Sequence, residues 1–343
     1  MEYWEEINHK LKPWIDTDLD KTVVDLFAGC GGLSLGFEAN GFKTIGYEMD
    51  ENACKTYNQN LIGECINEKL SIHSKYPKAN IVIGGPPCQP FSVGGKQLGL
   101  KDSRDGFPIF LSAISQLNPE ILLFENVRGM LYKNKSYLAE VIEELNKLGY
   151  RINYALLNAV NYEVPQNRER VIVIGSKGKI SLPQKVNRKV TVEQALGNLA
   201  FQHDKDSRFF TESMDKYVAN YEKASKCINP RDLYLDRPAR TLTCRNLAGA
   251  TGDMQRIKLK DGRRRRITIR EAARLQSFPD WFEFSGTETQ QFNQIGNAVA
   301  PYFAFHLAQN IKNQLLGKTS NHCFSTENNQ FILFENETVY QSR

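Results

Sequence analysis

The sequence lacks the features that mark secreted, membrane-spanning and zinc-stabilised proteins. No uncharged apolar stretch reaches the roughly 18 residues that a membrane-spanning helix needs. The N-terminus, MEYWEEINHK, has no basic run followed by an apolar core, as a signal peptide would. The seven cysteines are scattered, without a Cys-x-x-Cys pair or a metal-type spacing, and their odd number leaves at least one thiol free. We therefore expect a cytoplasmic protein with no disulfide framework, no metal and no membrane partner.

Net charge is also low, at +5 over 343 residues, but its distribution is uneven. Residues 184–286 hold 21 Lys and Arg against 13 Asp and Glu, a net of +8, and the remainder has a net of −3. A polyanion could dock on this block, although an unpartnered basic surface would have the same composition. Hydrophobic residues make up 41%, enough for a substantial core of one large domain or two ordinary ones.

Short apolar runs alternate with helical periodicity in the first half of the chain. We expect strands at 22–27, 43–48, 81–85, 121–126 and 171–175, and helices at 31–40, 109–117 and 136–148. Such alternation predicts an α/β fold with a mainly parallel sheet and helices on both faces. This alternation of apolar runs and helical patterns is lost after Ser176, and regular patterning returns at 269–275 and 301–316. Residues 1–20 suit a short helix, and 331–340 a hairpin.

The first expected strand runs into a glycine-rich turn, Phe27-Ala28-Gly29-Cys30-Gly31-Gly32. Ligands of such sheets bind beyond the carboxyl ends of the strands, where glycines let the backbone come close. A dinucleotide fingerprint would need glycine at position 34, where Ser34 stands, so a pyrophosphate cradle is disfavoured. Glu48 ends the second strand, where a carboxylate either accepts hydrogen bonds from ribose hydroxyls or is simply solvated.

The strand at 81–85 leads to a single cysteine, Cys88, behind two prolines. The prolines stiffen the approach, and a glycine-rich stretch at 94–99 is a candidate mobile lid. A free cysteine is usually a small buried hydrophobe. Rigid presentation at a strand end favours a nucleophile instead.

A carboxylate and two arginines follow at the next strand ends. Glu125 comes directly after ILLF, so it either is paired or faces a site, where a desolvated carboxyl could donate a proton. Arg168 and Arg170 stand at i and i+2 on an extended segment and face the same way. One of them could reach a substrate oxygen while the other pairs with a carboxylate, or both could form surface ion pairs.

Together these residues resemble the DNA (cytosine-5) methyltransferase family, of the bacterial restriction-modification type. The resemblance runs from Thr22 to Pro301 and keeps the family's motif order. Its motifs are FAGCGG (27–32) with Glu48, PPCQPFS (86–92), ENV (125–127), QNRER (166–170), REAARLQSFP (270–279) and QIGNAV (294–299). In this family the segment before REAARLQ is the target-recognition domain, and here it coincides with the basic block.

The resemblance implies a Rossmann-like S-adenosylmethionine-dependent sheet with a second, smaller domain. We expect the catalytic and cofactor-binding domain over 1–183, the target-recognition domain with its supporting segment over 184–286, and a return to the catalytic domain plus a tail over 287–343. The implied cofactor-binding residues are Phe27, Gly29, Cys30, Gly32, Leu33, Glu48, Met49, Asn67, Pro87, Asn297 and Val299. The implied DNA-binding residues are Gln89, Ser92, Thr241, Leu242, Arg245, Arg263, Arg264, Arg265 and Arg266, the last four holding backbone rather than bases.

The resemblance also implies a mechanism. Cys88 adds to C6 of a cytosine flipped out of duplex DNA, and the methyl group passes from S-adenosylmethionine to C5. Glu125 binds N3 and the exocyclic amine, Arg170 holds O2, and Arg168 supports the neighbourhood of Cys88 or Glu125. The chain departs from the family at Asn67, where an acidic residue often stands, and in the length of DGFPIF after Arg104.

Three alternatives stay open. An RNA (tRNA) cytosine-5 methyltransferase shares every catalytic motif, but its usual Cys-Phe-Thr element is matched only by Cys323-Phe324-Ser325 in the tail. A nicotinamide-dependent oxidoreductase rests only on the glycine-rich turn and Glu48. A non-catalytic DNA-binding relic conflicts with an intact Cys88 and Glu125. We expect a monomer acting on double-stranded DNA. Whether a cognate restriction endonuclease belongs to the same system stays open, and the recognised DNA sequence cannot be derived from the chain.

Overall fold

The computed structural model describes residues 1–87, 105–203, 207–224, 226, 232–249 and 254–318. Cys88, Gln89, Ser92, the glycine-rich stretch at 94–99 and the expected hairpin at 331–340 lie outside these ranges. No helix within the described ranges combines the length and apolarity needed to cross a membrane.

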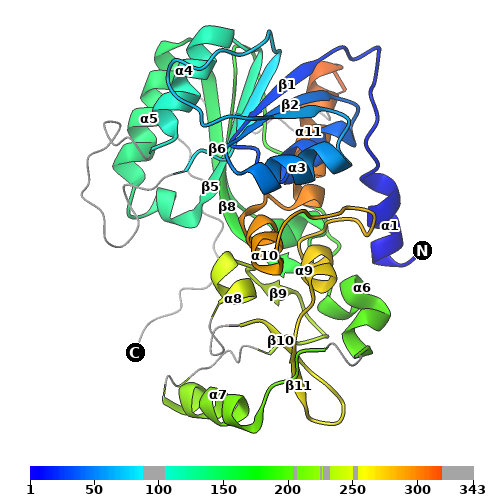
Figure 1. Ribbon diagram of the computed structural model, residues 1–343. Coiled ribbons are helices and arrows are strands. Elements are labelled where there is room, and N and C mark those ends of the chain that lie inside the picture. The colour runs from blue at the N-terminus through cyan, green and yellow to red at the C-terminus, as the bar shows by residue number, and fades with distance from the viewer. Residues whose placement is uncertain (88–104, 204–206, 225, 227–231, 250–253, 319–343) are drawn as a thin grey trace.

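A seven-stranded sheet forms the centre of the larger lobe (Figure 1). Its order is β3-β2-β1-β4-β5-β8-β6, and β1 to β5 run parallel while β8 runs antiparallel to β5 and β6. The strands are β1 Thr22–Leu26, β2 Lys43–Glu48, β3 Glu64–Asn67, β4 Ile81–Gly84, β5 Ile121–Val127, β6 Arg151–Asn158 and β8 Glu169–Ser176. The expectation of an α/β fold with a mainly parallel sheet is confirmed.

Helices cover both faces of the sheet (Figure 1). One face packs against α4 (Phe107–Leu117) and α5 (Lys135–Lys147), and the other against α2 (Gly32–Glu38), α3 (Glu51–Asn60) and α11 (Pro301–Leu315). Alternate strand residues point to opposite faces, so neighbours such as Val23 and Val24 belong to two different apolar clusters. This double burial explains why the central strands are continuous apolar runs.

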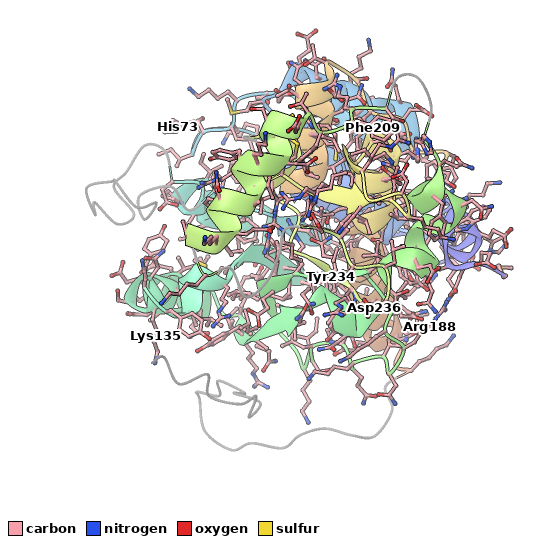
Figure 2. All side chains as sticks on the ribbon, turned by 90° about the horizontal axis from the view of Figure 1, so that it is seen from below. His73, Lys135, Arg188, Phe209, Tyr234 and Asp236 are labelled. Atoms are coloured by element: carbon pink, nitrogen blue, oxygen red, sulfur yellow. The ribbon has the colours of Figure 1, made fainter. Side chains whose placement is uncertain are left out.

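The remaining elements form a second lobe below the sheet, which we define as α7, α8 and β9 to β11 (Figure 1). Figure 2 looks onto this end of the molecule, with Tyr234 and Asp236 near the middle of the view. The lobe comprises α7 Glu212–Ala224, β9 Ala239–Arg240, α8 Cys244–Ala248, β10 Arg256–Lys258 and β11 Arg264–Arg266. The connecting elements are α1 Tyr3–Lys10, η3 Arg128–Leu131, η4 Ala159–Tyr162, β7 Gln166–Asn167, α6 Val192–Leu196, η5 Gly197–Phe201, α9 Ile269–Leu275 and α10 Glu288–Asn297.

The two lobes share one apolar core. Leu242, Leu247 and Ile257 of the second lobe belong to the same buried cluster as Val23 of the sheet. A two-residue parallel pairing of β7 with β9 also joins them. The expected domain limits at 183 and 286 stay a prediction.

Helix α2 crosses α11 at backbone distance, and Gly36 permits it. A Cβ built at Gly36 would lie 2.4 Å from the carbonyl carbon of Ala304 and 2.4 Å from the amide nitrogen of Phe305. Because both are backbone atoms, the helices would have to move apart. We expect Gly36→Ala to lower the free energy of unfolding by about 1–3 kcal/mol, measured by urea denaturation. Gly178→Ala is the control, since its Cβ would meet nothing within 4 Å; equal losses in both variants would contradict the packing argument.

A cluster of charged side chains holds α1 against the larger lobe. Glu6 is paired with Lys10 at 2.7 Å and with Arg188 at 2.6 Å. Burial alone would raise the pKa of Glu6, but these two partners outweigh it and lower the pKa to about 2. The folded pKa lies below the ordinary value of 4.5, so the ion pairs stabilise the fold fully above pH 4.5 and lose this effect as pH falls toward 2.

This sign makes a pH-dependent prediction. We expect Glu6→Gln to lower the melting temperature at pH 7, and the difference from wild type to shrink steadily below pH 4.5. Glu143→Gln is the matched control, because the Glu143–Lys147 pair is exposed and should contribute little at any pH. A Glu6→Gln difference that stays constant between pH 7 and pH 3 would refute the assignment.

Candidate active site

The glycine-rich turn after β1 is hydrogen-bonded to the side chain of Glu48. Phe27 and Gly29 adopt positive φ angles of 61° and 55°, and the Gly29 amide donates to Glu48 Oε2 at 2.9 Å. Glu48 Oε1 accepts from the Asp50 amide at 2.8 Å. The carboxylate is thereby held at the carboxyl end of β2 with lone pairs still available to hydroxyl donors.

The same turn packs directly on the QIGNAV segment. A Cβ on Gly32 would lie 2.4 Å from the Val299 carbonyl oxygen, so glycine is required for this close approach. Cys30 and Leu33 are buried, and burial raises the pKa of Cys30 to about 12. Their side chains face the core, so a cofactor could meet only their backbone. Cys30 is therefore unsuited to be a nucleophile.

Ser34, the residue that breaks the dinucleotide fingerprint, has a structural partner. Its hydroxyl donates to Asp25 Oδ2 at 2.7 Å beneath the turn. Burial raises the pKa of Asp25 to about 7, against the lowering effect of Ser34. Asp25 therefore supports the turn from inside the sheet.

Two further predicted cofactor residues lie beside Glu48. Asn67 ends β3 opposite Glu48 in the strand register, and its amide donates to the Glu48 carbonyl oxygen at 3.0 Å. Met49 is 66% exposed. An exposed apolar side chain, an exposed amide and a held carboxylate at one edge could hold a nucleoside. No group of three His, Cys, Asp or Glu side chains suited to a metal occurs among the described residues.

The chain entering Cys88 is held at Pro86 and Pro87. The Asn126 side chain donates to the Pro86 carbonyl at 2.9 Å, and the Gly106 amide donates to the Pro87 carbonyl at 3.0 Å. Asp105 is buried and accepts from Tyr137. Sequence reasoning missed these supports, although Asn126 stood in the ENV motif. Cys88 itself lies outside the described residues, but the backbone delivering it is fixed.

Glu125 and Arg170 form an ion pair across neighbouring strands. Arg170 Nε lies 2.6 Å from Glu125 Oε1, and their side chains are 13% and 12% exposed. Of the two predicted arginines, Arg170 is thus the one that pairs with a carboxylate. Arg168 instead donates to the backbone carbonyls of Leu242, Gly296 and Ala298. The shared orientation predicted for the two arginines brings both to one cavity.

That cavity has a volume of about 340 Å³, large enough for a nucleobase. Its lining combines the two arginine-motif residues with residues from the second lobe and from QIGNAV: Glu125, Val127, Arg168, Arg170, Thr243, Cys244, Arg245, Gly296 and Asn297. A neighbouring cavity of about 500 Å³ shares Val127 and Arg170 and also includes Arg128, Asn158, Asn167, Glu169 and Thr241. The ENV and QNRER motifs, both predicted to be catalytic, therefore converge on one concave surface.

Two residues predicted to contact DNA cannot do so with their side chains. Leu242 is fully buried in the core. Arg265 is 2% exposed and forms a two-pronged ion pair with Glu271, at 2.7 and 2.9 Å. Arg265 points inward because Arg264–Arg266 form strand β11, in which alternate side chains face opposite sides. Leu242 points inward because it belongs to the apolar core that the two lobes share. Arg265 holds β11 to α9.

The other predicted DNA contacts stay predictions. Arg263 is about half exposed and pairs with Asp261, and Arg264 pairs with Asp215 and Asp232. Thr241 donates to the Asn167 carbonyl beside the larger cavity. The Arg266 guanidinium makes a long contact of 3.4 Å to the Leu247 carbonyl, and burial lowers its pKa.

A family model of the C-5 cytosine-specific DNA methylases matches residues 21–313. The chain belongs to that family. This DNA cytosine methyltransferase is 53% identical over 325 residues to the type II methyltransferase M.AplI of Arthrospira platensis, a match that covers 93% of this chain and 94% of the relative. It is 33% identical over 373 residues to the type II methyltransferase M.BsuRI of Bacillus subtilis, covering 92% and 84%. These relatives support the restriction-modification type.

Solved structures agree on the fold of this methyltransferase. A putative DNA modification methyltransferase encoded within an E. coli prophage superposes with a TM-score of 0.64 at 25% identity, covering 87% of this chain and 100% of that one. A Spodoptera frugiperda DNMT2 mutant superposes with a TM-score of 0.66 at 18% identity, covering 85% and 100%, and supports the fold alone. The family assignment excludes the oxidoreductase and non-catalytic alternatives.

Proposed function

We propose that this methyltransferase moves a methyl group from S-adenosylmethionine to C5 of a cytosine flipped out of a short, specific duplex DNA sequence. The observation that carries the proposal is the cavity of about 340 Å³ in which the Glu125–Arg170 pair faces the second lobe. A buried carboxylate and guanidinium side by side match the donor and acceptor edge of cytosine. A base inside a stacked duplex could not reach them.

Cys88 acts as the covalent nucleophile. C5 of cytosine is a poor nucleophile, so it must be activated before it can accept a methyl group. The Cys88 thiolate bonds to C6, and the electrons of the C5–C6 double bond shift toward C4 and N3. The resulting enamine makes C5 nucleophilic. After methylation, loss of the C5 proton to water restores the double bond and expels the thiolate. Free cysteine has a pKa near about 8.5, so the reaction requires a positive or dipolar environment at Cys88 that favours the thiolate.

Glu125 and Arg170 hold the base during this addition. Glu125 binds N3 and the exocyclic amine, and it stabilises the charge that develops when C6 is attacked. Arg170 binds O2 while its Nε keeps Glu125 in place. A paired, little-exposed carboxylate is rigid, so it costs no reorganisation at the moment of reaction.

The cofactor surface is the turn after β1 with the ends of β2 and β3. S-adenosylmethionine supplies an electrophilic methyl group when bound. Glu48 would accept hydrogen bonds from the ribose hydroxyls and Met49 would cover the adenine. Asn67 would offer an amide at the adenine edge, where the family often has a charged residue. The turn, with its backbone close to Val299, orients this ligand toward the base cavity. No metal is needed for this chemistry.

The second lobe grips the DNA. Its basic residues, including Arg245, Arg263 and Arg264, balance phosphates, and Gln89 and Ser92 follow the nucleophile closely enough in sequence to contact the same strand. We propose that the protein acts as a cytoplasmic monomer on duplex DNA, because each strand can be methylated separately. The type II relatives favour a cognate restriction endonuclease as its partner in the same system.

Methyl transfer to nucleic acids of two kinds tests the proposal. The protein is incubated with S-adenosylmethionine carrying a labelled methyl group and either a duplex DNA library or bulk tRNA, and digested products are separated. We expect labelled 5-methylcytosine from DNA only, at one short sequence. Label in tRNA alone would replace the proposal with the RNA alternative, and label on another base or position would refute the C5 chemistry.

A further inference from the structure

Four chain segments meet in a buried contact between the lobes, which we call the seam. It consists of Gln166 to Arg168, Leu242 to Cys244, Leu275 with Gln276, and Ile295 to Ala298. The first segment belongs to the arginine motif. The second leads into α8 of the second lobe. The contacts across the seam are polar although Gln166, Arg168 and Gln276, which make them, are buried.

Arg168 binds both sides of the seam. Its guanidinium donates to the Leu242 carbonyl at 2.8 Å, to the Ala298 carbonyl at 2.9 Å and to the Gly296 carbonyl at 3.3 Å. The side chain is 2% exposed, and burial together with nearby Arg170 lowers its pKa to about 9. A buried cation is costly unless its partners are well placed. Here the partners are carbonyls of two segments that must then stay together.

Two glutamines complete the same junction. Gln166 accepts from the Leu242 amide at 2.8 Å and donates to the Leu275 carbonyl at 3.1 Å. It also donates to the side chain of Gln276. Gln276 in turn donates to the carbonyls of Ile295 at 2.9 Å and Ala298 at 2.8 Å. Both amides are fully buried, so each contact fixes one segment against another.

The backbones at the seam lie too close for any side chain at Gly296. A Cβ there would be 2.5 Å from the Cys244 amide nitrogen and 2.8 Å from the Thr243 carbonyl carbon. Beside it, Cys244 Sγ lies 2.9 Å from Asn297 Oδ1. The second lobe therefore touches QIGNAV by main chain as well as by side chains.

The seam is also a wall of the base cavity. Arg168, Thr243, Cys244, Gly296 and Asn297 line the cavity of about 340 Å³ together with Glu125 and Arg170. Any movement of the second lobe relative to the sheet must alter the shape of this cavity. Docking of the second lobe on DNA and the geometry around Glu125 are thus mechanically connected.

We propose that Arg168, with Gln166 and Gln276, is a positioning residue that couples target recognition to catalysis. It holds the Leu242–Cys244 segment at the cavity wall, so that the cavity is correctly shaped only when the second lobe sits correctly on its DNA sequence. Arg168 then contributes to discrimination between target sequences and does not itself contact the base. This inference rests on the proposed function, which supplies the reaction being coupled.

Arg168→Lys tests the coupling, because lysine keeps the charge but cannot bind three carbonyls in one plane. The measurement is the ratio of kcat/KM on the target duplex to kcat/KM on a duplex with one altered base pair. We expect this ratio to fall by at least about tenfold, because an altered base pair would no longer be sensed at the cavity wall. Hydrogen exchange should accelerate at residues 241–246 and 294–300.

Arg274→Lys is the matched control for stability. Arg274 is also little exposed and binds a carbonyl, that of Leu196, together with Asp280, but it does not line the cavity. We expect it to lower the melting temperature without changing the discrimination ratio. Gln276→Ala provides a second test that leaves the arginine intact, and it should reduce the ratio in the same direction.

Two results would overturn the inference. If Arg168→Lys lowers kcat equally on both duplexes, Arg168 acts directly on the base. If it lowers only the melting temperature, as Arg274→Lys should, the seam is merely structural. Failure of the proposed function is distinguishable, because wild type would then methylate no cytosine in DNA, while the hydrogen-exchange comparison would still report on the seam.

Discussion

Cys88→Ala is expected to form no covalent complex with duplex DNA that contains 5-fluorocytosine, whereas wild type with S-adenosylmethionine is expected to be trapped on it. Fluorine at C5 cannot leave as a proton does, so the bond between Cys88 and C6 persists after methyl transfer. On ordinary DNA the variant should lose at least about 10⁴-fold in rate, which corresponds to about 5.5 kcal/mol of barrier. Denaturing electrophoresis measures the trapped fraction.

Comparison with other cysteines of the chain tests whether Cys88 in particular is the nucleophile. Cys30 is excluded as a nucleophile by burial, which raises its pKa to about 12. Cys244 lines the base cavity, and burial raises its pKa as well. Trapping that survives in Cys88→Ala but disappears in Cys244→Ala would transfer the nucleophile to Cys244. Cys54→Ala, which alters a buried thiol of α3 away from the cavity, should be trapped like wild type.

Glu125→Gln should have the second largest effect. The glutamine keeps the size of the side chain and an oxygen for Arg170, but it loses the negative charge and the ability to take up and release a proton during attack at C6. We expect the single-turnover rate to fall by about 10²–10⁴-fold, as for loss of an acid–base group. DNA affinity, measured by fluorescence anisotropy, should change little, because the second lobe supplies most phosphate contacts.

Glu120→Gln is the control for this variant. Glu120 directly precedes β5, at the end opposite Glu125, and pairs with Lys21 at 2.6 Å on the surface. Its replacement should leave the single-turnover rate within a factor of about two, since exposed ion pairs contribute little. If both variants reduced the rate alike, the effect would reflect general instability of β5 rather than chemistry at Glu125.

The central strands were predictable because they are buried on both faces. TVVDL, KTIGYE, IVIG and ILLFENV are apolar runs, and the structure confirms strands there within a residue or two. The expected helices at 31–40, 109–117 and 136–148 are confirmed as α2, α4 and α5. Strands β3 and β6 went unrecognised because they are the two edges of the sheet. Most positions of β3 and β6 are exposed or half-buried, so their sequences mix polar with apolar residues and the apolar signal is weak.

The roles of individual arginines were much less predictable. The run from Arg263 to Arg266 suggested a uniform phosphate-binding surface, but strand geometry buries Arg265 against Glu271. Arg168 and Arg170 were known to share a side of their segment, yet only the fold decides that one pairs with Glu125 and the other with three carbonyls. The partners of Arg168 lie 74 to 130 positions away in the chain.

The sequence by itself determined the order of the motifs, the parallel strands that bring their ends to one edge, and hence the family. These features depend on local composition and on short spacings, which a chain carries in any conformation. The tertiary structure alone decided how the second lobe meets the cavity: the Gly296 contact, the glutamine pair and the three carbonyls of Arg168. Such contacts join segments that are distant in sequence. Because every residue has a backbone carbonyl, no residue type in the sequence marks the carbonyls that will be contacted.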